Sequence, residues 1–359
     1  MKQNAIKHLR PEEIEANFPP SKIFFDRFCA GQDISRQDSE LLFDEVIRGL
    51  LTDIEITALL VALKIKGETP QEIAGAASIL RREALDFDRP SYLFADSAGT
   101  GGGGALTFNI STAAAFAAAA CGLPMAKHGN RSVSSRSGSA DVLEALGAKV
   151  SLKPDAARAC LDEIGFTFLY APLYHQAVKN VGVVRKELKT RTVFNILGPL
   201  VNPAHPPVQL VGVYAPGLCR PVVETLKLLG CRSAMVVHGS GVDEVALHGP
   251  TEGFTLKDGK IRKITLTPEK LGLEECDLSS LEGGSALDNA RIIKNILSGY
   301  GGDAQAGVVA ANAGVLLYLA GLAKSIRSGV ARASRALSDG SSLDILERFV
   351  RYSIKHGGT

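Results

Sequence analysis

Residues 96–112 read DSAGTGGGGALTFNIST, and this stretch decides the fold class. It continues a short apolar segment, contains four consecutive glycines at 101–104, and leads into an alanine-rich run from residue 113. A strand, a glycine-rich turn and a helix in this order form a typical anion site, because backbone N–H groups of the turn and of the first helical turn reach the ligand. A flexible loop before an ordinary capped helix would use the same residues. The stretch matches neither G-x-x-x-x-G-K-[ST] nor G-x-G-x-x-G.

Beyond this stretch, short β-rich segments alternate with helical ones, which predicts an α/β fold with a central, mostly parallel sheet. Strands are expected within 93–99, 123–129, 149–152, 209–214, 233–239, 244–249, 253–256 and 263–266. Helices are expected within 140–147, up to residue 229, within 288–299 and within 306–323.

Before residue 85 the pattern is helical, with apolar residues at three- and four-residue spacing. Ser35, Thr52 and Thr69 are predicted N-caps, and Gly49 and Gly67 are predicted stop signals. We therefore predict a small all-helical domain over residues 1–88 and a large α/β domain over residues 89–359.

Composition excludes several classes of protein. The chain has 359 residues, a net charge of +2, six scattered cysteines without a C-x-x-C pair, and seven histidines without H-E-x-x-H spacing. The charge gives no reason to expect nucleic acid or an anionic membrane as partner, and a structural zinc is not expected. The thiols are expected to be free and buried. The first 20 residues lack an apolar signal core, and the apolar runs 113–126 and 308–323 are too short to span a membrane, which predicts a cytoplasmic protein.

Two further segments suit a polyphosphate. The segment 127–139, KHGNRSVSSRSGS, packs three cations among five serines, a mixture suited to phosphate and sugar, although a solvated polar loop could also have it. Asp243 and Glu244 are adjacent carboxylates after a predicted strand. Such a pair is commonly solvated surface, but beside a polyphosphate it becomes a candidate anchor for Mg²⁺.

A basic cluster lies between residues 175 and 191. It contains His175, Lys179, Arg185, Lys186, Lys189 and Arg191. An exposed basic helix face is one interpretation, and capture of a small carboxylate by an arginine is the other.

Together, these segments resemble the anthranilate phosphoribosyltransferase family. The shared motifs are GTGG at 99–102, TFNIST at 107–112, KHGNR at 127–131, SGSADVLEALG at 137–147, H-x9-R-K-E-L from His175, RT-x-FN-x-LGPL-x-NPA at 191–204 and HG-x-G-x-DE at 238–244. The resemblance covers roughly residues 20–345.

The resemblance implies a nucleoside-phosphorylase-like transferase fold and a homodimer formed through the helical domains. It also implies that a mid-chain segment around residues 185–202 contributes to the helical domain, and that the active site lies between the domains. The implied substrates are anthranilate and phosphoribosyl pyrophosphate, and the implied cofactor is Mg²⁺.

The resemblance also implies residue roles. Ser111, Asp243 and Glu244 would hold Mg²⁺, while Lys127 and Arg185 would support the transition state without an obligatory general base. Anthranilate would be surrounded by His128, Asn130, His175, Arg185 and Gly198. The other substrate-binding residues would be Gly99, Thr100, Gly101, Gly102, Gly103, Thr107, Asn109, Ser111, Thr112, Lys127, Gly129, Arg131 and Ser135.

The chain departs from the family pattern at two positions. Gly103 stands where the family has aspartate, which leaves the number of Mg²⁺ ions open, and Gln176 replaces a proline.

Two other functions remain alternatives. One is a pyrimidine nucleoside phosphorylase, which shares the fold, and the other is a catalytically inactive paralogue that binds nucleic acid through the cations of 179–191.

Overall fold

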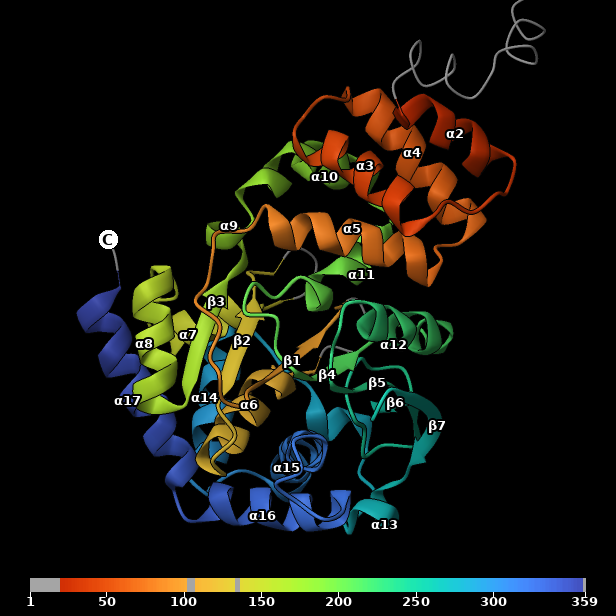
Figure 1. Cartoon of the computed structure of the whole chain (residues 1–359). Helices are drawn as coiled ribbons and strands as arrows, with labels where there is room; N and C mark the ends of the chain where they lie inside the picture. Colours follow the sequence, from red (N-terminus) through yellow and green to blue (C-terminus); the bar gives the residue numbers. More distant parts are fainter. Residues whose placement is uncertain (1–19, 102–106, 133–135, 358–359) are drawn as a thin grey trace, which may run out of the picture. The chain divides into compact units, whose positions relative to one another are not determined.

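The computed structural model describes residues 20–101, 107–132 and 136–357 (Figure 1). The chain divides into two compact units. One contains the described residues up to Glu83 together with Ala177–Leu197, and the other contains Ala84–Gln176 and the residues from Gly198 onward. The sequence placed the domain boundary at residue 88 and the mid-chain segment at about 185–202.

The described residues of the first unit form helices and no strand. Its first part contains α2 (Pro20–Cys29), α3 (Arg36–Ile47), α4 (Asp53–Lys66) and α5 (Pro70–Arg82), and its second part contains most of η2 (Gln176–Val181), α10 (Gly182–Leu188) and α11 (Val193–Leu197). The second part packs on the first: Asn180 donates a hydrogen bond to the Ile47 carbonyl at 2.7 Å, and the rings of Phe43 and Phe194 lie 6.0 Å apart.

The predicted caps of this unit are confirmed. Ser35, Thr52 and Thr69 each accept a hydrogen bond from the third helical residue and complete a capping box. Such a box pairs two N–H groups that a helix start would otherwise leave open. Gly67 ends α4 as predicted, with a φ of 88°.

The second unit contains a seven-stranded sheet in the order β3-β2-β1-β4-β5-β6-β7. The first five strands in this order are parallel to one another. Strand β6 pairs antiparallel with β5, and β7 pairs antiparallel with β6. This confirms the predicted α/β class and the mostly parallel sheet. The strands are β1 (Ala95–Gly99), β2 (Met125–Gly129), β3 (Phe166–Tyr170), β4 (Val208–Gly212), β5 (Ser233–Gly239), β6 (Thr251–Lys257) and β7 (Lys260–Leu266).

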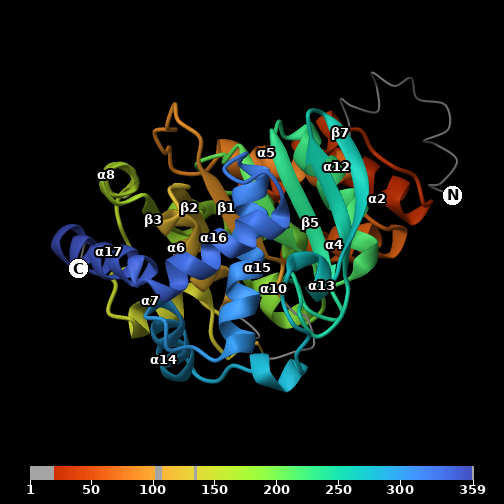
Figure 2. The same ribbon diagram turned by 90° about the horizontal axis from the view of Figure 1, so that it is seen from below.

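Helices surround this sheet. They are α6 (Ile110–Ala120), α7 (Ser139–Ala145), α8 (Pro154–Ile164), α9 (Ala171–Tyr174), α12 (Cys219–Leu228), α13 (Pro268–Leu271), α14 (Ala286–Leu297), α15 (Asp303–Leu319), α16 (Ile326–Ser338) and α17 (Ser341–His356), with short 3₁₀ turns η3 (Gly198–Leu200), η4 (Pro216–Leu218) and η5 (Leu278–Leu281). Figure 1 shows α15 and α16 below the strands, and Figure 2, seen from below, shows them side by side in front of the sheet. Helix α15 also packs on α6, β4 and β5.

The core of this unit is formed around α6, whose alanines are almost entirely buried. Small side chains let neighbouring elements approach the helix closely, and Phe116 then stacks on Phe166 at 4.2 Å. None of the six cysteines is in a disulfide; Cys121, Cys160 and Cys219 are buried, whereas Cys29 is exposed, contrary to the expectation of burial. Among the described residues, no helix is long and apolar enough to cross a membrane.

Two predicted strands are absent. Residues 149–152 form no strand, because the Lys149 N–H bonds the Ser353 hydroxyl at 2.9 Å and no neighbouring strand. Val150 and Leu152 are nevertheless buried, which accounts for their apolar character. Residues 244–249 form no strand either, because the backbone N–H groups of Val245 and Ala246 bond the side chains of Asn312 and Thr251.

Candidate active site

The carboxyl ends of the parallel strands carry the candidate site. Strands β1, β4 and β5 end in Gly99, Gly212 and Gly239. A Cβ added at Gly99 would lie 2.2 Å from the Asp243 carboxylate, and one added at Gly212 would lie 1.6 Å from the Asp243 carbonyl. The strand-end glycines therefore let the Asp243–Glu244 segment lie directly on the sheet edge.

Asp243 fixes the start of the glycine-rich turn. Its Oδ2 accepts a hydrogen bond from the Gly101 N–H at 2.7 Å, and Gly101 has a φ of 70°. This positive φ suits glycine. Asp243, which lies far along the chain, thus holds Gly101 at the start of the stretch where the sequence predicts an anion site.

Glu244 lies at the beginning of α6. Its Oε1 accepts a hydrogen bond from the Ser111 N–H at 3.2 Å. Burial raises the pKa of the Glu244 carboxyl to about 8, Asp243 adds to the increase, and Lys127 and Ser111 oppose it. A carboxylate that is costly to ionise in this position is stabilised by a bound cation.

Lys127 crosses the same region from β2. It is 2 % exposed, and its Nζ donates to the Ser97 carbonyl at 2.6 Å and to the Ser111 hydroxyl at 3.3 Å. Burial lowers the pKa of Lys127, and the carboxylates of Asp96 and Glu244 counteract that decrease. The ammonium group therefore lies at the helix start where an anion would bind.

Asp96 joins β1 to β2 beneath this site. Its Oδ1 accepts from the His128 N–H at 3.3 Å, and its Oδ2 accepts from the Asn202 side chain at 2.8 Å. Burial raises the Asp96 pKa to about 6 against the opposing effect of Lys127 and these hydrogen bonds.

Two predicted anthranilate residues meet in the α/β unit. The rings of His128 and His175 are 5.1 Å apart and meet edge to face, and both side chains are buried. His128 Nδ1 lies 3.3 Å from the Gly198 carbonyl, which can only accept, so this nitrogen carries the proton. The structure thus brings His128, His175 and Gly198 together.

Asn109 links the start of α6 to the next loop. Its side chain donates to the Ser137 carbonyl at 3.1 Å and accepts from the Asn289 side chain at 2.9 Å. Asn289 is 2 % exposed and gives Asn109 a fixed amide orientation.

Other predicted residues make local contacts. The Arg131 guanidinium forms two 2.6 Å hydrogen bonds with Glu144, and the Asn130 side chain accepts from the Arg131 N–H. The Thr100 hydroxyl accepts from the Tyr214 N–H at 3.0 Å. Thr107 forms an isolated bridge with Glu282, Thr112 is fully buried, and Gly129 is packed against Ser139 and Phe168.

Arg185 belongs to the helical unit. It lies on α10 with its guanidinium 5.4 Å from the centre of the Phe194 ring. Burial lowers the pKa of this guanidinium.

The predicted residues Gly102, Gly103 and Ser135 lie outside the described residues.

The donor set at the sheet edge fits Mg²⁺. Within the described ranges, no three His, Cys, Asp or Glu side chains gather as a metal site. Mg²⁺, however, commonly takes only one or two carboxylates and completes its shell with phosphate oxygens and water. Asp243, the buried carboxyl of Glu244 and the Ser111 hydroxyl provide such a partial set.

Sequence reasoning missed Asp96, Asn202, Asn289 and Asn312. Asp96 opens the quoted glycine stretch and Asn202 lies in the LGPL-x-NPA motif, so both had a sequence signal. Asn312 interrupts an apolar run, which was a weaker signal, and Asn289 had none that sequence alone could assign.

Comparison with known protein families identifies the class of protein. Residues 24–84 match the helical bundle domain of a glycosyl transferase family, and residues 91–343 match the a/b domain of that family. The two compact units therefore correspond to the two domains of a glycosyl transferase.

Individual relatives narrow this class. The anthranilate phosphoribosyltransferase of Sorangium cellulosum is 50% identical over 91% of this chain and 94% of its own length. The enzyme of the same name from Aeromonas hydrophila is 51% identical over 90% of this chain and 94% of its own length. The chain therefore belongs to the anthranilate phosphoribosyltransferase family.

Solved structures agree with this result. The anthranilate phosphoribosyltransferase of Thermus thermophilus has a TM-score of 0.88 and 38% identity, covering 92% of this chain and 99% of its own. The anthranilate phosphoribosyltransferase of Saccharomyces cerevisiae in complex with PRPP and Mg has a TM-score of 0.84 and 27% identity, and the match covers 95% of this chain and 99% of the yeast chain.

Proposed function

We propose that this protein transfers the phosphoribosyl group of phosphoribosyl pyrophosphate to the amino group of anthranilate, releasing diphosphate, in tryptophan biosynthesis. The observation that carries the proposal is the convergence of Ser111, Lys127, Asp243 and Glu244 at the carboxyl edge of the sheet. About half of the residues of this chain are identical to those of the named relatives, which supports the same reaction.

The diphosphate would bind at the start of α6. The positive end of the helix dipole favours negative charge there, and the Ser111 hydroxyl and the Lys127 ammonium already face this place. The glycine-rich turn 99–103 would supply further backbone donors, with Thr107, Asn109, Thr112, Gly129, Arg131 and Ser135 completing the site.

Mg²⁺ would be held by Asp243, Glu244 and Ser111. When bound, the ion neutralises charge on the diphosphate and so makes it a better leaving group. The number of ions depends on whether Gly103 removes a ligand, which stays a prediction from the sequence.

The reaction places few demands on acid–base chemistry. The aromatic amine of anthranilate is neutral at pH 7, so its lone pair can attack the anomeric carbon without a strong base. This chain's residues would act by positioning the two substrates and by stabilising charge, with Lys127 at the diphosphate. His128, Asn130, His175, Gly198 and Arg185 are the predicted anthranilate residues.

The two alternatives are less well supported. An inactive nucleic-acid-binding paralogue would leave the Lys127, Asp243 and Glu244 arrangement without a purpose. The KHGNR motif and the H-x9-R motif from His175 argue against a nucleoside phosphorylase. The named relatives support the transferase instead.

The direct test follows anthranilate fluorescence. We expect it to be consumed only when both phosphoribosyl pyrophosphate and Mg²⁺ are present. The double variant Asp243→Asn, Glu244→Gln should nearly abolish turnover, because it removes charge and keeps side-chain volume. The matched control is Glu274→Gln, Glu275→Gln, an exposed adjacent pair that should keep full activity. Consumption without phosphoribosyl pyrophosphate would refute the proposed reaction.

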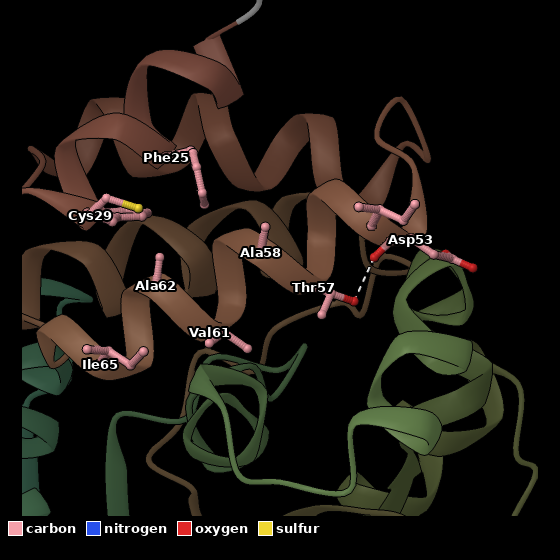
Figure 3. A pocket seen from close by; sticks show the side chains of 10 residues that line it. Phe25, Cys29, Asp53, Thr57, Ala58, Val61, Ala62 and Ile65 are labelled. Atoms are coloured by element: carbon pink, nitrogen blue, oxygen red, sulfur yellow. Dashed lines mark hydrogen bonds between the residues drawn. The ribbon is translucent and has the colours of Figure 1, made fainter.

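We also propose that the protein is a homodimer through its helical units and that it resides in the cytoplasm. Side chains of α2 and α4 line an open, largely apolar hollow of about 750 Å³ (Figure 3). Ile54 and Ile65 at its rim are each 81 % exposed. Exposed apolar side chains gathered on one face support contact with a second copy of the chain.

A further inference from the structure

The segment that carries the proposed metal ligands, residues 242–246, lies outside the regular sheet. Val242 and Gly239 exchange two backbone hydrogen bonds of 2.9 and 3.1 Å, which close a tight turn after β5. Beyond this turn, the Val245 backbone bonds a side chain and forms no ladder with a strand.

That side chain is Asn312, in the middle of α15. Its Oδ1 accepts from the Val245 N–H at 3.0 Å, and its Nδ2 donates to the carbonyls of Val245 at 3.1 Å and Val308 at 2.9 Å. Asn312 is 0 % exposed, and its neighbours on the helix are apolar. Asparagine forms helices less well than alanine or leucine, and a buried amide is costly unless it is bonded.

The opposite side of the segment is also fixed. Added Cβ atoms at Gly212 and Gly239 would lie 1.6 Å from the Asp243 carbonyl and 2.3 Å from the Glu244 carbonyl. The backbone of Asp243 and Glu244 is therefore enclosed between the strand ends and the Asn312 amide. A shift on the Asn312 side would move the backbone that carries both carboxylates.

We infer that Asn312 is a positioning residue for the metal site: its amide replaces a missing strand partner and fixes where the Asp243 and Glu244 carboxylates point. The inference rests on the proposed function, because it takes these carboxylates as the Mg²⁺ ligands. The competing explanation is that Asn312 only stabilises α15 in the core.

The test measures metal binding directly. Mn²⁺, a paramagnetic substitute for Mg²⁺, is titrated into the protein with phosphoribosyl pyrophosphate present, and free Mn²⁺ is followed by electron paramagnetic resonance. Asn312→Leu should raise the Mn²⁺ concentration for half-saturation by roughly tenfold or more, where tenfold corresponds to about 1.4 kcal/mol. The KM for anthranilate should change less than twofold.

Two further variants separate positioning from folding. Leu317→Ala removes a fully buried side chain from the same helix and should leave Mn²⁺ half-saturation unchanged even if the melting temperature falls. Asn312→Ser keeps one small hydrogen-bonding group and serves if Asn312→Leu does not fold. In either Asn312 variant, amide hydrogen exchange of the peptide containing Val245 should become faster without ligands.

The outcomes are distinct. Unchanged Mn²⁺ half-saturation in a folded Asn312 variant overturns the inference, as does an equal change in Leu317→Ala. If Asp243→Asn, Glu244→Gln itself leaves Mn²⁺ binding intact, the proposed metal site is what fails.

Discussion

Arg185 carries its positive charge into a half-buried position against the Phe194 ring, where burial disfavours the charged form. A bound carboxylate would compensate this cost. Arg185→Ala should therefore raise the KM for anthranilate by roughly 10- to 150-fold, as expected for a lost charge-assisted bond of about 1.5–3 kcal/mol. The KM for phosphoribosyl pyrophosphate should change little.

Lys186→Ala is the matched control for this prediction, because Lys186 is the exposed neighbour on α10. Steady-state kinetics with each substrate varied in turn give both KM values. Equal changes in the two would remove Arg185 from the acceptor pocket.

Asp96 predicts a pH dependence of stability. Its folded-state pKa of about 6 lies above the usual value near 3.8, so the folded state holds this proton more tightly than the unfolded state. The contribution of Asp96 to the free energy of unfolding is therefore greatest below pH 4 and is lost as the pH rises to about 6. The loss amounts to at most about 3 kcal/mol.

The measurement compares wild type with Asp96→Asn. Denaturant unfolding between pH 4 and 7.5 should show the stability of wild type falling relative to the variant, with a constant difference above about pH 6.5. A stability difference that rises with pH would mean that Lys127 and the hydrogen bonds to Asp96 lower its pKa by more than burial raises it.

At the residue scale, the sequence predicted the proposed ligand-binding groups more completely than the residues that hold those groups in place. Lys127, Asp243 and Glu244 could be predicted, because charge in glycine- and serine-rich loops is itself a chemical signal. Asn289 could not, since its partner Asn109 lies 180 positions away and nothing local marks the contact.

Among the elements, α15 and α16 approach each other closely along their backbones. A Cβ added at Gly314 would lie 2.5 Å from the Val330 backbone nitrogen, and one added at Gly329 would lie 2.4 Å from the Gly314 carbonyl. Gly314→Ala should destabilise the protein by about 1–3 kcal/mol, because the two helices must move apart.

Gly307→Ala on the same helix is the control. The added methyl there meets only the ends of two side chains, Leu247 at 3.1 Å and Leu273 at 3.8 Å. Alanine also favours a helix over glycine by about 1 kcal/mol, so this variant should be neutral or slightly stabilised in thermal unfolding. Equal losses in both variants would contradict the close-packing argument.

Element prediction succeeded where the signal is local. The caps at Ser35, Thr52 and Thr69 are specified by residues three positions apart. Residues 244–249 are predicted as a strand, yet the Val245 N–H bonds a side chain 67 positions away, which a local pattern cannot reveal.

For the whole molecule, the oligomeric state is the principal prediction. If α2 and α4 form the dimer contact, Ile54→Glu with Ile65→Glu should convert a dimer into a monomer in sedimentation experiments, because buried charge opposes association. Leu287→Glu, on an exposed leucine of α14, should leave the dimer intact. A wild-type protein that sediments as a monomer at micromolar concentration would refute the dimer.

The pattern of strands and helices was sufficient to predict the α/β class. The return of the chain to the helical unit was not visible in that pattern, since 177–197 contains only short helical turns. It came from the resemblance to a known family.

The helical unit is assembled from two pieces of chain, and this has a consequence for its synthesis. Roughly 90 residues separate Glu83 from Ala177. At about 5–20 residues per second, the ribosome needs on the order of 5–20 s to make them. During this time the nascent helices lack the Phe194 ring that packs on Phe43, so newly made chains have a window in which a chaperone can bind this apolar surface.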